Sequence, residues 1–445
     1  MSALAAIPKY EVYKESGVDW LGTIPSDWDT RRIKFVFSET NERSKDGSEE
    51  LLSVSQYTGV TKKSDKLAEN DLLTNAETLE GYKKVAQGEL VSNIMLAWNG
   101  SLGFSSFDGI VSPAYSVYRL LGDNNQRYFH YLLRTDAYKA EYKRRSSGVI
   151  ESRLRLYTND FFDTRSLLPP VEEQVAIAYF LDQKTTQIDE AISIKEKQIA
   201  LLKERKQIII QKAVTQGLNP DVPMKDSGVD WVGQIPEYWE VKKLKFISTY
   251  FKGFAFKSDD FSDTGVPIVK AGNIKEHSVS NIQTFIANDN QRREFEKFRL
   301  STGDVVVSTV GSKPEITNSA VGQLCSIDSE YNESYLNQNT VCIRPHRKLD
   351  NRFLKYVFAS KYVRNEFDRK ALWIANQAYL EVDEILDILI SIPELGEQSS
   401  ISDYLDSQAV KFSKAIDSQL QQIEKLKEYK TTLINSAVTG KIKVA

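Results

Sequence analysis

The side chains that could perform catalysis are few and scattered in this chain of 445 residues. Its histidines are His130, His277 and His346, and their spacing suggests no partnered Ser/His or Cys/His nucleophile. Its two cysteines, Cys325 and Cys342, form no Cys-x-x-Cys or Cys/His cluster, so we expect reduced thiols and no metal site. The residue types and their spacing therefore argue against nucleophilic, acid–base and metal-dependent catalysis.

Cofactor-binding and phosphate-binding motifs are also missing from the sequence. It contains neither the GxxxxGK[S/T] loop that cradles nucleotide phosphates nor the Asn/Asp-Pro-Pro-aromatic loop and Gly-rich turn of a base-flipping adenine methyltransferase. Glu-x-Lys pairs of the nuclease kind occur at Glu141, Glu204 and Glu428, but each is typical of a solvated helix surface. We expect no enzymatic activity from the chain itself.

Charge and hydrophobicity place the chain among ordinary globular proteins. The formal net charge is −3, with 41% hydrophobic and 27% charged residues. Basic residues are nevertheless concentrated locally, with six against two acidic residues between Lys139 and Arg155. No apolar run approaches the ~18 residues of a membrane span, and the N-terminus has no basic leader, so we expect a cytoplasmic protein.

Two pairs of similar segments open and close the two halves of the chain. SGVDWLGTIPSDW, from Ser16, returns as SGVDWVGQIPEYW, from Ser227, 211 residues later. LPPVEEQ, from Leu168, returns as IPELGEQ, from Ile392, 224 residues later. Between these ends the halves scarcely agree, which indicates a common scaffold with two differently shaped middles.

Each half closes on a long amphipathic helix, from about Glu172 to Gln216 and again 224 residues later. Apolar residues recur at coiled-coil spacing along both segments, and each segment ends at a glycine. One narrow apolar stripe cannot stabilise a lone helix in water, so we expect the two helices to pack antiparallel as a rod of roughly 60 Å. The predicted seam consists of Ile188, Ile192, Ile199, Leu202, Ile209, Phe412, Ile416, Ile423, Leu426 and Leu433.

The segments before these helices combine strand-like and helix-like patterns. Strands are predicted at 51–57, 88–96 and 114–120 in the first half, and at 266–274, 303–310 and 339–345 in the second. One helix follows in each half, over 125–145 and 351–367. We therefore expect a mixed α/β fold with two α/β domains in pseudo-twofold arrangement, separated by two long antiparallel coiled-coil helices. The predicted boundaries are 1–168, 169–220, 221–391 and 392–445.

The duplicated segments carry a family resemblance. SGVDWLGTIPSDW and SGVDWVGQIPEYW resemble the openings of the target-recognition domains in specificity subunits of type I restriction–modification systems. LPPVEEQ and IPELGEQ resemble the Pro-x-x-x-Glu-Gln entrance to the conserved helices of that family. The resemblance covers essentially the whole chain, from about Lys9 to Lys441.

The resemblance implies a set of partners. Each domain of such a subunit reads one half of a bipartite target in double-stranded DNA, and the helix pair sets the unread spacer. Two methyltransferase subunits dock on the scaffold, and restriction (translocase) subunits join them. S-adenosylmethionine, ATP and Mg²⁺ bind those partners, so the resemblance implies no cofactor and no metal on this chain, and no membrane.

Base readout uses Arg or Lys on guanine, Asn or Gln on adenine, and apolar contacts on thymine. In the first half, the predicted readers lie in the basic loop after the helix and in the loop after the first strand: Arg144, Arg145, Ser147, Arg153, Gln56, Tyr57 and Lys62. In the second half they lie in VKAGNI and in DRKALWIANQAYL: Lys270, Asn273, Arg369, Lys370, Asn376 and Gln377.

Two other classes of function remain open from the residues alone. One is an enzyme, such as a minimal nuclease or a fused methyltransferase, and metal-dependent cleavage by the isolated chain would reveal it. The other is a duplicated coiled-coil adaptor that binds only protein, which would show no sequence-dependent DNA affinity even with its partners present.

Overall fold

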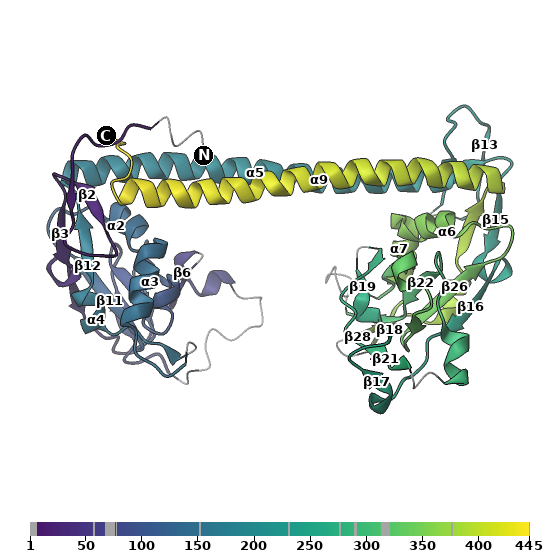
Figure 1. The fold of residues 1–445 in the computed structure, drawn as a ribbon, viewed down its shortest axis with the longest axis horizontal. Coiled ribbons are helices and arrows are strands. Elements are labelled where there is room, and N and C mark those ends of the chain that lie inside the picture. Colours follow the sequence, from purple (N-terminus) through teal and green to yellow (C-terminus); the bar gives the residue numbers. More distant parts are fainter. Residues whose placement is uncertain are drawn as a thin grey trace. The chain divides into compact units, whose positions relative to one another are not determined.

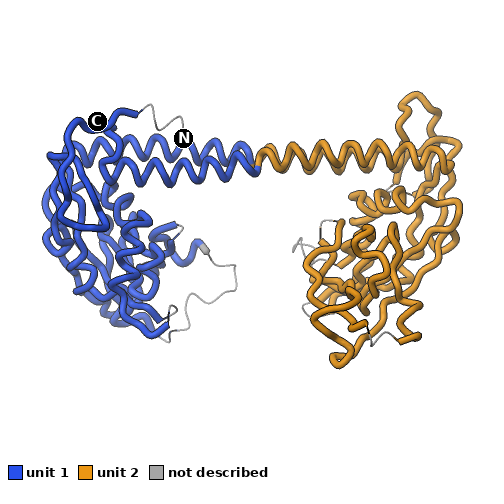
Figure 2. The backbone as a smooth tube through the Cα atoms, viewed as in Figure 1, with its two compact units in different colours: residues 1–195, 420–445 blue, residues 196–419 orange. Residues whose placement is uncertain are grey.

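The chain forms two compact units in a computed structural model. Unit 1 comprises residues 1–195 and 420–445, and unit 2 comprises residues 196–419 (Figure 2). The structure describes residues 7–56, 58–66, 76, 78–150, 153–229, 232–275, 277–288, 292–312, 321–374 and 377–444. The two units divide each long helix between them, whereas the sequence-based boundaries set the helices apart as separate segments.

In its described residues, unit 1 has short strands, three short helices and parts of the two long helices (Figure 1), packed around one main core. Its strands are β1 (Tyr13–Glu15), β2 (Thr23–Pro25), β3 (Asp29–Arg32), β4 (Phe37–Thr40), β5 (Leu52–Ser55), β6 (Gly59–Lys62), β7 (Lys83–Val85), β8 (Leu90–Asn93), β9 (Leu102–Phe104), β10 (Gly109–Val111), β11 (Tyr115–Leu120) and β12 (Arg165–Leu168). Its short helices are α2 (Gln126–Leu132), α3 (Asp136–Arg145) and α4 (Thr158–Asp163).

Unit 2 repeats this plan with a more elaborate set of strands. They are β13 (Met224–Asp226), β14 (Gln234–Pro236), β15 (Glu240–Lys243), β16 (Ser248–Lys252), β17 (Phe261–Ser262), β18 (Val266–Val269), β19 (Ile274–Lys275), β20 (Ser278–Val279), β21 (Phe285–Ile286), β22 (Val305–Ser308), β23 (Val310–Gly311), β24 (Leu324–Ser326), β25 (Tyr335–Leu336), β26 (Thr340–Pro345), β27 (Leu372–Ile374), β28 (Gln377–Tyr379) and β29 (Leu389–Ile392). Its short helices are α6 (Asn351–Ala359), α7 (Lys361–Lys370) and α8 (Val382–Leu386).

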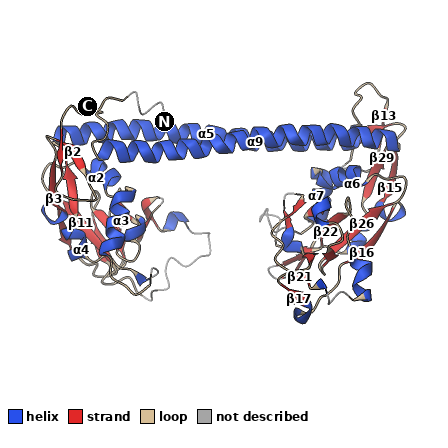
Figure 3. Ribbon diagram, viewed as in Figure 1, coloured by secondary structure: helices blue, strands red, loops and turns tan. Residues whose placement is uncertain are grey.

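Each unit contains an equivalent four-stranded antiparallel sheet, in the order β4-β11-β8-β9 in unit 1 and β16-β26-β22-β24 in unit 2. Figure 3 shows strands of both sheets, among them β11, β16, β22 and β26. The ladder between β3 and β12 likewise matches the ladder between β15 and β29. The ladder between β1 and β2 matches the ladder between β13 and β14 in the same way. The other strands differ: unit 1 adds the pairs β5–β6 and β7–β10, whereas unit 2 adds the pair β19–β20 and the sheets β17-β21-β18-β25 and β23-β28-β27. The mixed α/β fold is therefore confirmed, and the structural differences lie where the two halves differ in sequence.

The single helix predicted in each half is wrong, because each is two helices. Helix α2 ends before Thr135 and α3 begins after it, and Ser360 separates α6 from α7 in the same way. The Thr135 hydroxyl donates to the Leu132 carbonyl at 2.9 Å, and the Ser360 hydroxyl donates to the Val357 carbonyl. Each hydroxyl thus hydrogen-bonds to a carbonyl of the preceding turn, while the backbone of the same residue is extended. The first helix ends and the next begins at this break.

The two long helices are α5 (Val171–Gln216) and α9 (Leu395–Val438). They run antiparallel in unit 1, where Asp189 pairs with Lys430 at 2.7 Å and Lys195 donates to Gln422. Ile188, Phe412, Ile423 and Leu433 of the predicted seam are buried. Its other members are half-buried, namely Ile192, Ile199, Leu202, Ile209, Ile416 and Leu426. Gly217 and Gly440 follow the two helix ends with φ of 73° and 72°, a conformation that glycine adopts without strain.

Both cysteines are buried within unit 2, and they form no disulfide with each other. Cys325 and Cys342 lie on β24 and β26, on either side of Val306 in β22. Burial raises the pKa of Cys325 to about 12, so this thiol stays protonated and unreactive at neutral pH. Among the described residues, no group of three His, Cys, Asp or Glu side chains could hold a metal ion. No helix in the described parts of the chain is long and apolar enough to cross a membrane.

Candidate functional site

The Glu-Gln pair at the start of α5 fixes unit 1 to this helix. The buried Gln174 accepts a hydrogen bond from the backbone N–H of Asn125, at 2.9 Å, and donates to the Pro169 carbonyl at 2.9 Å. Glu173 accepts from the indole of the buried Trp28, at 2.9 Å. One dipeptide therefore hydrogen-bonds to the backbone at the start of α2, to the backbone just before α5 and to the indole in the opening repeat.

Unit 2 reproduces these contacts at the start of α9. Gln398 accepts from the backbone N–H of Asp350 at 2.8 Å and donates to the Pro393 carbonyl at 2.8 Å. Glu397 accepts from the indole of Trp239 at 3.1 Å. The duplicated Glu-Gln motifs thus anchor the strands and short helices of each unit to its long helix. We call each such set of contacts an anchor.

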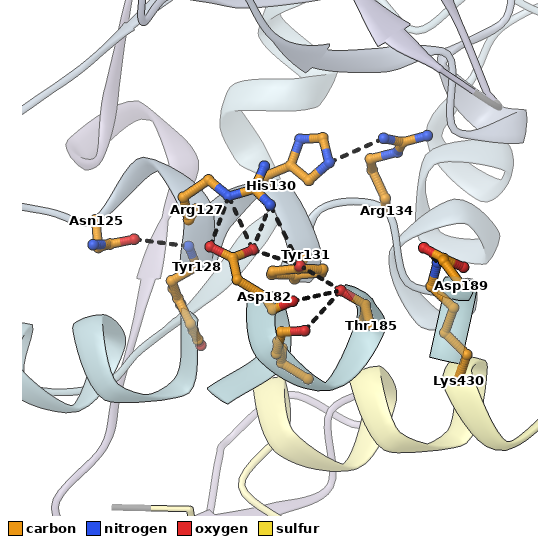
Figure 4. A network of polar contacts seen from close by, with 11 residues as sticks. Asn125, Arg127, Tyr128, His130, Tyr131, Arg134, Asp182, Thr185, Asp189 and Lys430 are labelled. Atoms are coloured by element: carbon orange, nitrogen blue, oxygen red, sulfur yellow. Dashed lines mark hydrogen bonds and ion pairs between the residues drawn. The ribbon is translucent and has the colours of Figure 1, made fainter. Parts of the chain in front are cut away.

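A second duplicated network lies about two turns further along each long helix, at Asp182 of α5 and Asp406 of α9. In unit 1, Arg127 and the Tyr131 hydroxyl both donate to Asp182 of α5 (Figure 4). In unit 2, Arg352 and Tyr356 donate to Asp406 of α9 in the same way.

The pKa of Asp182 reflects two opposing influences. Burial alone would raise this pKa, but the hydrogen bonds from Arg127 and Tyr131 outweigh burial and lower it. Asp182 therefore stays ionised at neutral pH.

Sequence reasoning missed both networks as contacts, although a signal existed. Arg127 and Tyr131 recur 225 residues later as Arg352 and Tyr356, close to the 224-residue spacing of the closing repeats. Chemically matched charged and aromatic residues at a repeat spacing, inside otherwise divergent segments, indicate a retained polar contact.

A third polar group in unit 1 is formed by residues that are not repeated at the equivalent positions of unit 2. The guanidinium of Arg134 contacts the Nε2 of His130 at 3.1 Å (Figure 4). It also donates to the carbonyl of Gln56, the residue after β5. The positions 225 residues later are Lys355 and Ala359, which cannot form the same pair. Burial, and then the charges of Arg134 and Arg127, lower the pKa of His130 to about 3, so this imidazole is neutral at physiological pH.

His130 and Arg134 line a cavity of about 390 Å³ between the β5–β6 hairpin, α2 and the long helices of unit 1. Gln56, predicted to read DNA, is one of its lining residues, and its carbonyl is held by Arg134. Its predicted neighbour Tyr57 lies outside the described residues. Lys62 lies on β6, half-buried, with its ammonium 5.4 Å from the ring centre of Phe107.

The predicted basic loop of unit 1 begins at the end of α3. Arg144 and Arg145 both donate to the buried Glu141, through Nε atoms at 2.7 and 2.6 Å. These hydrogen bonds, Arg144 first, lower the pKa of Glu141 despite its burial. The Arg144 side chain remains 66% exposed, whereas Arg145 is only 24% exposed. Arg144 is therefore the more accessible of the two to a ligand.

The rest of this loop folds back on itself. Ser147 and Arg155 form a two-way backbone bridge, with both N···O distances at 3.0 Å. Gly148 packs so closely that an added Cβ would lie 2.6 Å from the Arg153 carbonyl. The Arg153 side chain is exposed, as are Val149 and Ile150.

The equivalent loop of unit 2 repeats the arginine–glutamate pair. Arg369 donates to the buried Glu366 at 3.0 and 2.7 Å and is itself 69% exposed. Lys370 pairs instead with Glu384 of α8. The predicted Gln377 lies exposed at the start of β28, and Asn376 lies outside the described residues.

The VKAGNI segment presents its two predicted readers differently. The Asn273 amide accepts from the Lys270 backbone N–H at 2.9 Å and donates to the carbonyls of Ser280 and Asn281. Its polar atoms hold a turn together, which leaves little hydrogen-bonding capacity for a base. Lys270 donates to the Thr284 hydroxyl at 2.9 Å and lies 4.3 Å from the ring centre of Phe261, and burial lowers its pKa.

Comparison with known proteins adds to this geometry. Residues 236–428 match the family described as "Type I restriction modification DNA specificity domain". Over 375 residues, the chain is 27% identical to the type I restriction enzyme MjaVIII specificity subunit of Methanocaldococcus jannaschii, covering 82% of this chain and 83% of that protein. It is 26% identical to the EcoKI specificity subunit of Escherichia coli over 222 residues, or 47% of this chain and 44% of that one.

Solved structures show the same fold at low sequence identity. A chain from a study of complex assembly and conformational transition in the type I R-M system superposes with a TM-score of 0.66 at 15% identity, covering 93% of this chain and 98% of the other. The HsdS subunit from Thermoanaerobacter tengcongensis gives a TM-score of 0.51 at 16% identity, over 94% of this chain and 98% of that subunit.

Proposed function

Because this chain belongs to the specificity subunits of type I restriction–modification systems, we propose that it is a non-catalytic subunit that reads a bipartite DNA target, one half with each unit. The observation that carries the proposal is the contrast between repeated and unrepeated structure. The anchors at Glu173–Gln174 and Glu397–Gln398 and the central four-stranded sheet are the same in both units, whereas the additional strands and the loops differ. Two copies of one scaffold with different loops suit two different half-sites.

The repeated arginines suit phosphate contacts better than base readout. Arg144 and Arg369 occupy equivalent positions, are mostly exposed and are held by the buried carboxylates of Glu141 and Glu366. Phosphate contacts position a protein on DNA without carrying sequence information, so both half-sites require them equally. Base-reading residues, in contrast, must differ wherever the half-sites differ.

We assign the unread spacer of the target to the helix pair. Helices α5 and α9 contain 46 and 44 residues, and each continues from one unit into the other. At ~1.5 Å per residue they extend about 69 and 66 Å.

Lengthening both helices equally tests this assignment. Seven residues inserted after Lys195 and seven opposite them, at Gln422, preserve the coiled-coil phase and add about 10 Å. The recognised gap should grow by about three base pairs at ~3.4 Å each, with both half-sites unchanged. The control inserts seven residues in α5 alone, which breaks the register and should abolish binding. Altered half-sites with an unchanged gap would contradict the assignment.

Apolar side chains outside the seam provide docking surfaces for two methyltransferase subunits. Helix α5 exposes Val175 and Tyr179 in unit 1, and Leu201 and Ile208 in unit 2, at 49%, 66%, 63% and 52%. Exposed apolar residues in a row along a helix mark protein interaction surfaces. Restriction subunits join the complex through the methyltransferase subunits. S-adenosylmethionine, ATP and Mg²⁺ bind to these partner subunits.

Methylome sequencing of cells that carry this chain and its cognate methyltransferase tests the function directly. The expected result is one motif with two short specific halves around a fixed gap. An assembled complex that methylates no such motif would instead favour an adaptor that binds only protein. DNA cleavage by the isolated chain with a divalent metal would favour an enzyme.

A further inference from the structure

An exposed apolar ribbon follows helix α7 in unit 2. Strand β27 pairs antiparallel with β28, and β28 also pairs with β23, so β27 lies at the edge of this sheet. The side chains of Leu372, Trp373 and Ile374 are 50%, 46% and 69% exposed. An edge strand that presents apolar side chains and no charge is a surface that proteins normally cover.

The register of the ribbon sorts its side chains onto two faces. Leu372 lies opposite Tyr379, and Ile374 lies opposite Gln377, so these residues share one face. All of them are exposed. On the other face, Ala378 is fully buried in the core of the unit. Trp373 lies opposite Ala378 and is 46% exposed, so this face is attached to unit 2 through Ala378. The other face presents two aliphatic side chains, a tyrosine and an amide.

We propose that this ribbon enters the major groove of DNA and reads an A·T base pair. The proposal rests on the DNA-reading function proposed above. The major groove admits a two-stranded ribbon, glutamine hydrogen-bonds to adenine N6 and N7, and aliphatic side chains contact the thymine methyl group. Adenine N6 and N7 and the thymine methyl group lie on the same groove edge of one base pair, just as Gln377 and Ile374 are neighbours across the ribbon. Leu372 extends the aliphatic contact.

Charge around the ribbon favours DNA as its occupant. Arg369 lies near the end of helix α7, just before β27, and its guanidinium is mostly exposed although it pairs with Glu366, whereas the ammonium of Lys370 pairs with Glu384. Positive charge beside an apolar reading face complements a groove lined by phosphates.

Comparison with unit 1 also favours DNA over a protein partner. The equivalent segment there, between Ser147 and Arg155, exposes Val149 and Ile150 at 97% and 53% but has a different sequence and no counterpart of Gln377. A protein bound twice through equivalent surfaces would favour the same residues in both units. Two unlike half-sites favour different ones.

The experiment measures the contribution of thymine methyl groups to binding by the complete complex of this chain with its methyltransferase. A duplex selected from a random-sequence library is the first probe. The same duplex with uracil in place of thymine, in one half-site at a time, is the second. The variants are Leu372→Ala, Ile374→Ala and Gln377→Ala. The control is Phe246→Ala, because Phe246 is as exposed as Ile374, at 69% each, but recurs in unit 1 as Phe35.

The expected result is that uracil in one half-site weakens binding roughly fourfold for each contacted methyl group, equivalent to about 0.8 kcal/mol. Ile374→Ala should remove this uracil effect in that half-site only, Gln377→Ala should relax the preference for one A·T pair, and Phe246→Ala should change neither. Uracil having no effect on a selected motif, or the effect persisting in Ile374→Ala, would overturn the ribbon assignment while leaving DNA reading intact. Loss of the methyltransferase from Ile374→Ala, with DNA selectivity retained, would overturn it in favour of a protein contact. Selection of no motif by an assembled complex would overturn both the ribbon assignment and the proposed function.

Discussion

Replacing Gln398 with alanine should loosen unit 2 at the junction of α6 and α9. Its side chain, fully buried, accepts from the Asp350 N–H at 2.8 Å and donates to the carbonyls of Lys348 and Pro393 at 2.9 and 2.8 Å. Gln398→Ala leaves these three backbone groups without their partner. At about 1 kcal/mol or more for each unsatisfied buried group, the opening free energy of this region should fall by about 3 kcal/mol.

Hydrogen exchange read segment by segment measures this loss, because a chain with two units need not unfold in one step. A loss of about 3 kcal/mol corresponds to roughly 100-fold lower protection of the α6 amides. Gln174→Ala should produce a smaller loss at α2 in unit 1 and leave α6 unchanged, since Gln174 satisfies two backbone groups there, the Asn125 N–H and the Pro169 carbonyl, and its third contact is the Asn124 side chain. The exposed Gln198 of α5 provides the control substitution. If Gln398→Ala lowers protection no more than Gln198→Ala, the anchor does not contribute as the geometry requires.

Three further predictions follow from unit 1 and from the repeated arginines. His130 stays neutral to about pH 3 in the folded state, but in the unfolded state it is protonated near pH 6.5. The free energy of unfolding therefore falls as the pH drops from about 6.5 towards 3, by up to about 1.4 kcal/mol per pH unit. His130→Gln keeps an acceptor for Arg134 and should flatten this dependence in urea unfolding compared at about pH 7 and about pH 5. Gly440→Ala should lower the melting temperature more than Gly22→Ala, because both glycines have positive φ but only at Gly440 would the new Cβ meet a proline ring, at 2.4 Å. Arg369→Ala should weaken binding similarly for all DNA sequences and reduce the salt slope of the binding constant by about 1, and an unchanged slope would place this side chain away from phosphate.

The sequence could predict the scaffold because the scaffold is encoded by local pattern and by repetition. Apolar residues at coiled-coil spacing predicted α5 and α9, and every member of the predicted seam is buried or half-buried. The breaks at Thr135 and Ser360 were not predicted, because both lie within apolar patterns that continue across them. At each break the backbone of Thr135 or Ser360 is extended, and both its N–H and its hydroxyl donate to a carbonyl of the preceding turn.

The candidate DNA-contacting residues were predicted from residue type alone, which does not reveal how a polar side chain is already used. Asn273 is as suitable for adenine as Gln377 by type, yet its amide holds a turn while that of Gln377 is exposed. The exposed aliphatic face of β27 was missed for the opposite reason. Leu372 and Ile374 look like core residues in the sequence, and only the register of the ribbon places them on the outer face.

The contacts repeated in the two units and the contacts that differ have separate physical tasks. A buried dipeptide such as Glu173–Gln174 satisfies backbone groups at a fixed geometry, and any change there leaves buried polar atoms without partners, so a duplicated chain keeps it in both copies. An exposed ribbon such as β27–β28 satisfies no buried group, so its side chains can change at little cost to the fold. If the ribbon reads DNA as proposed, a chain built this way can acquire a new half-site by altering one ribbon, without disturbing the anchors that hold that unit to its helix.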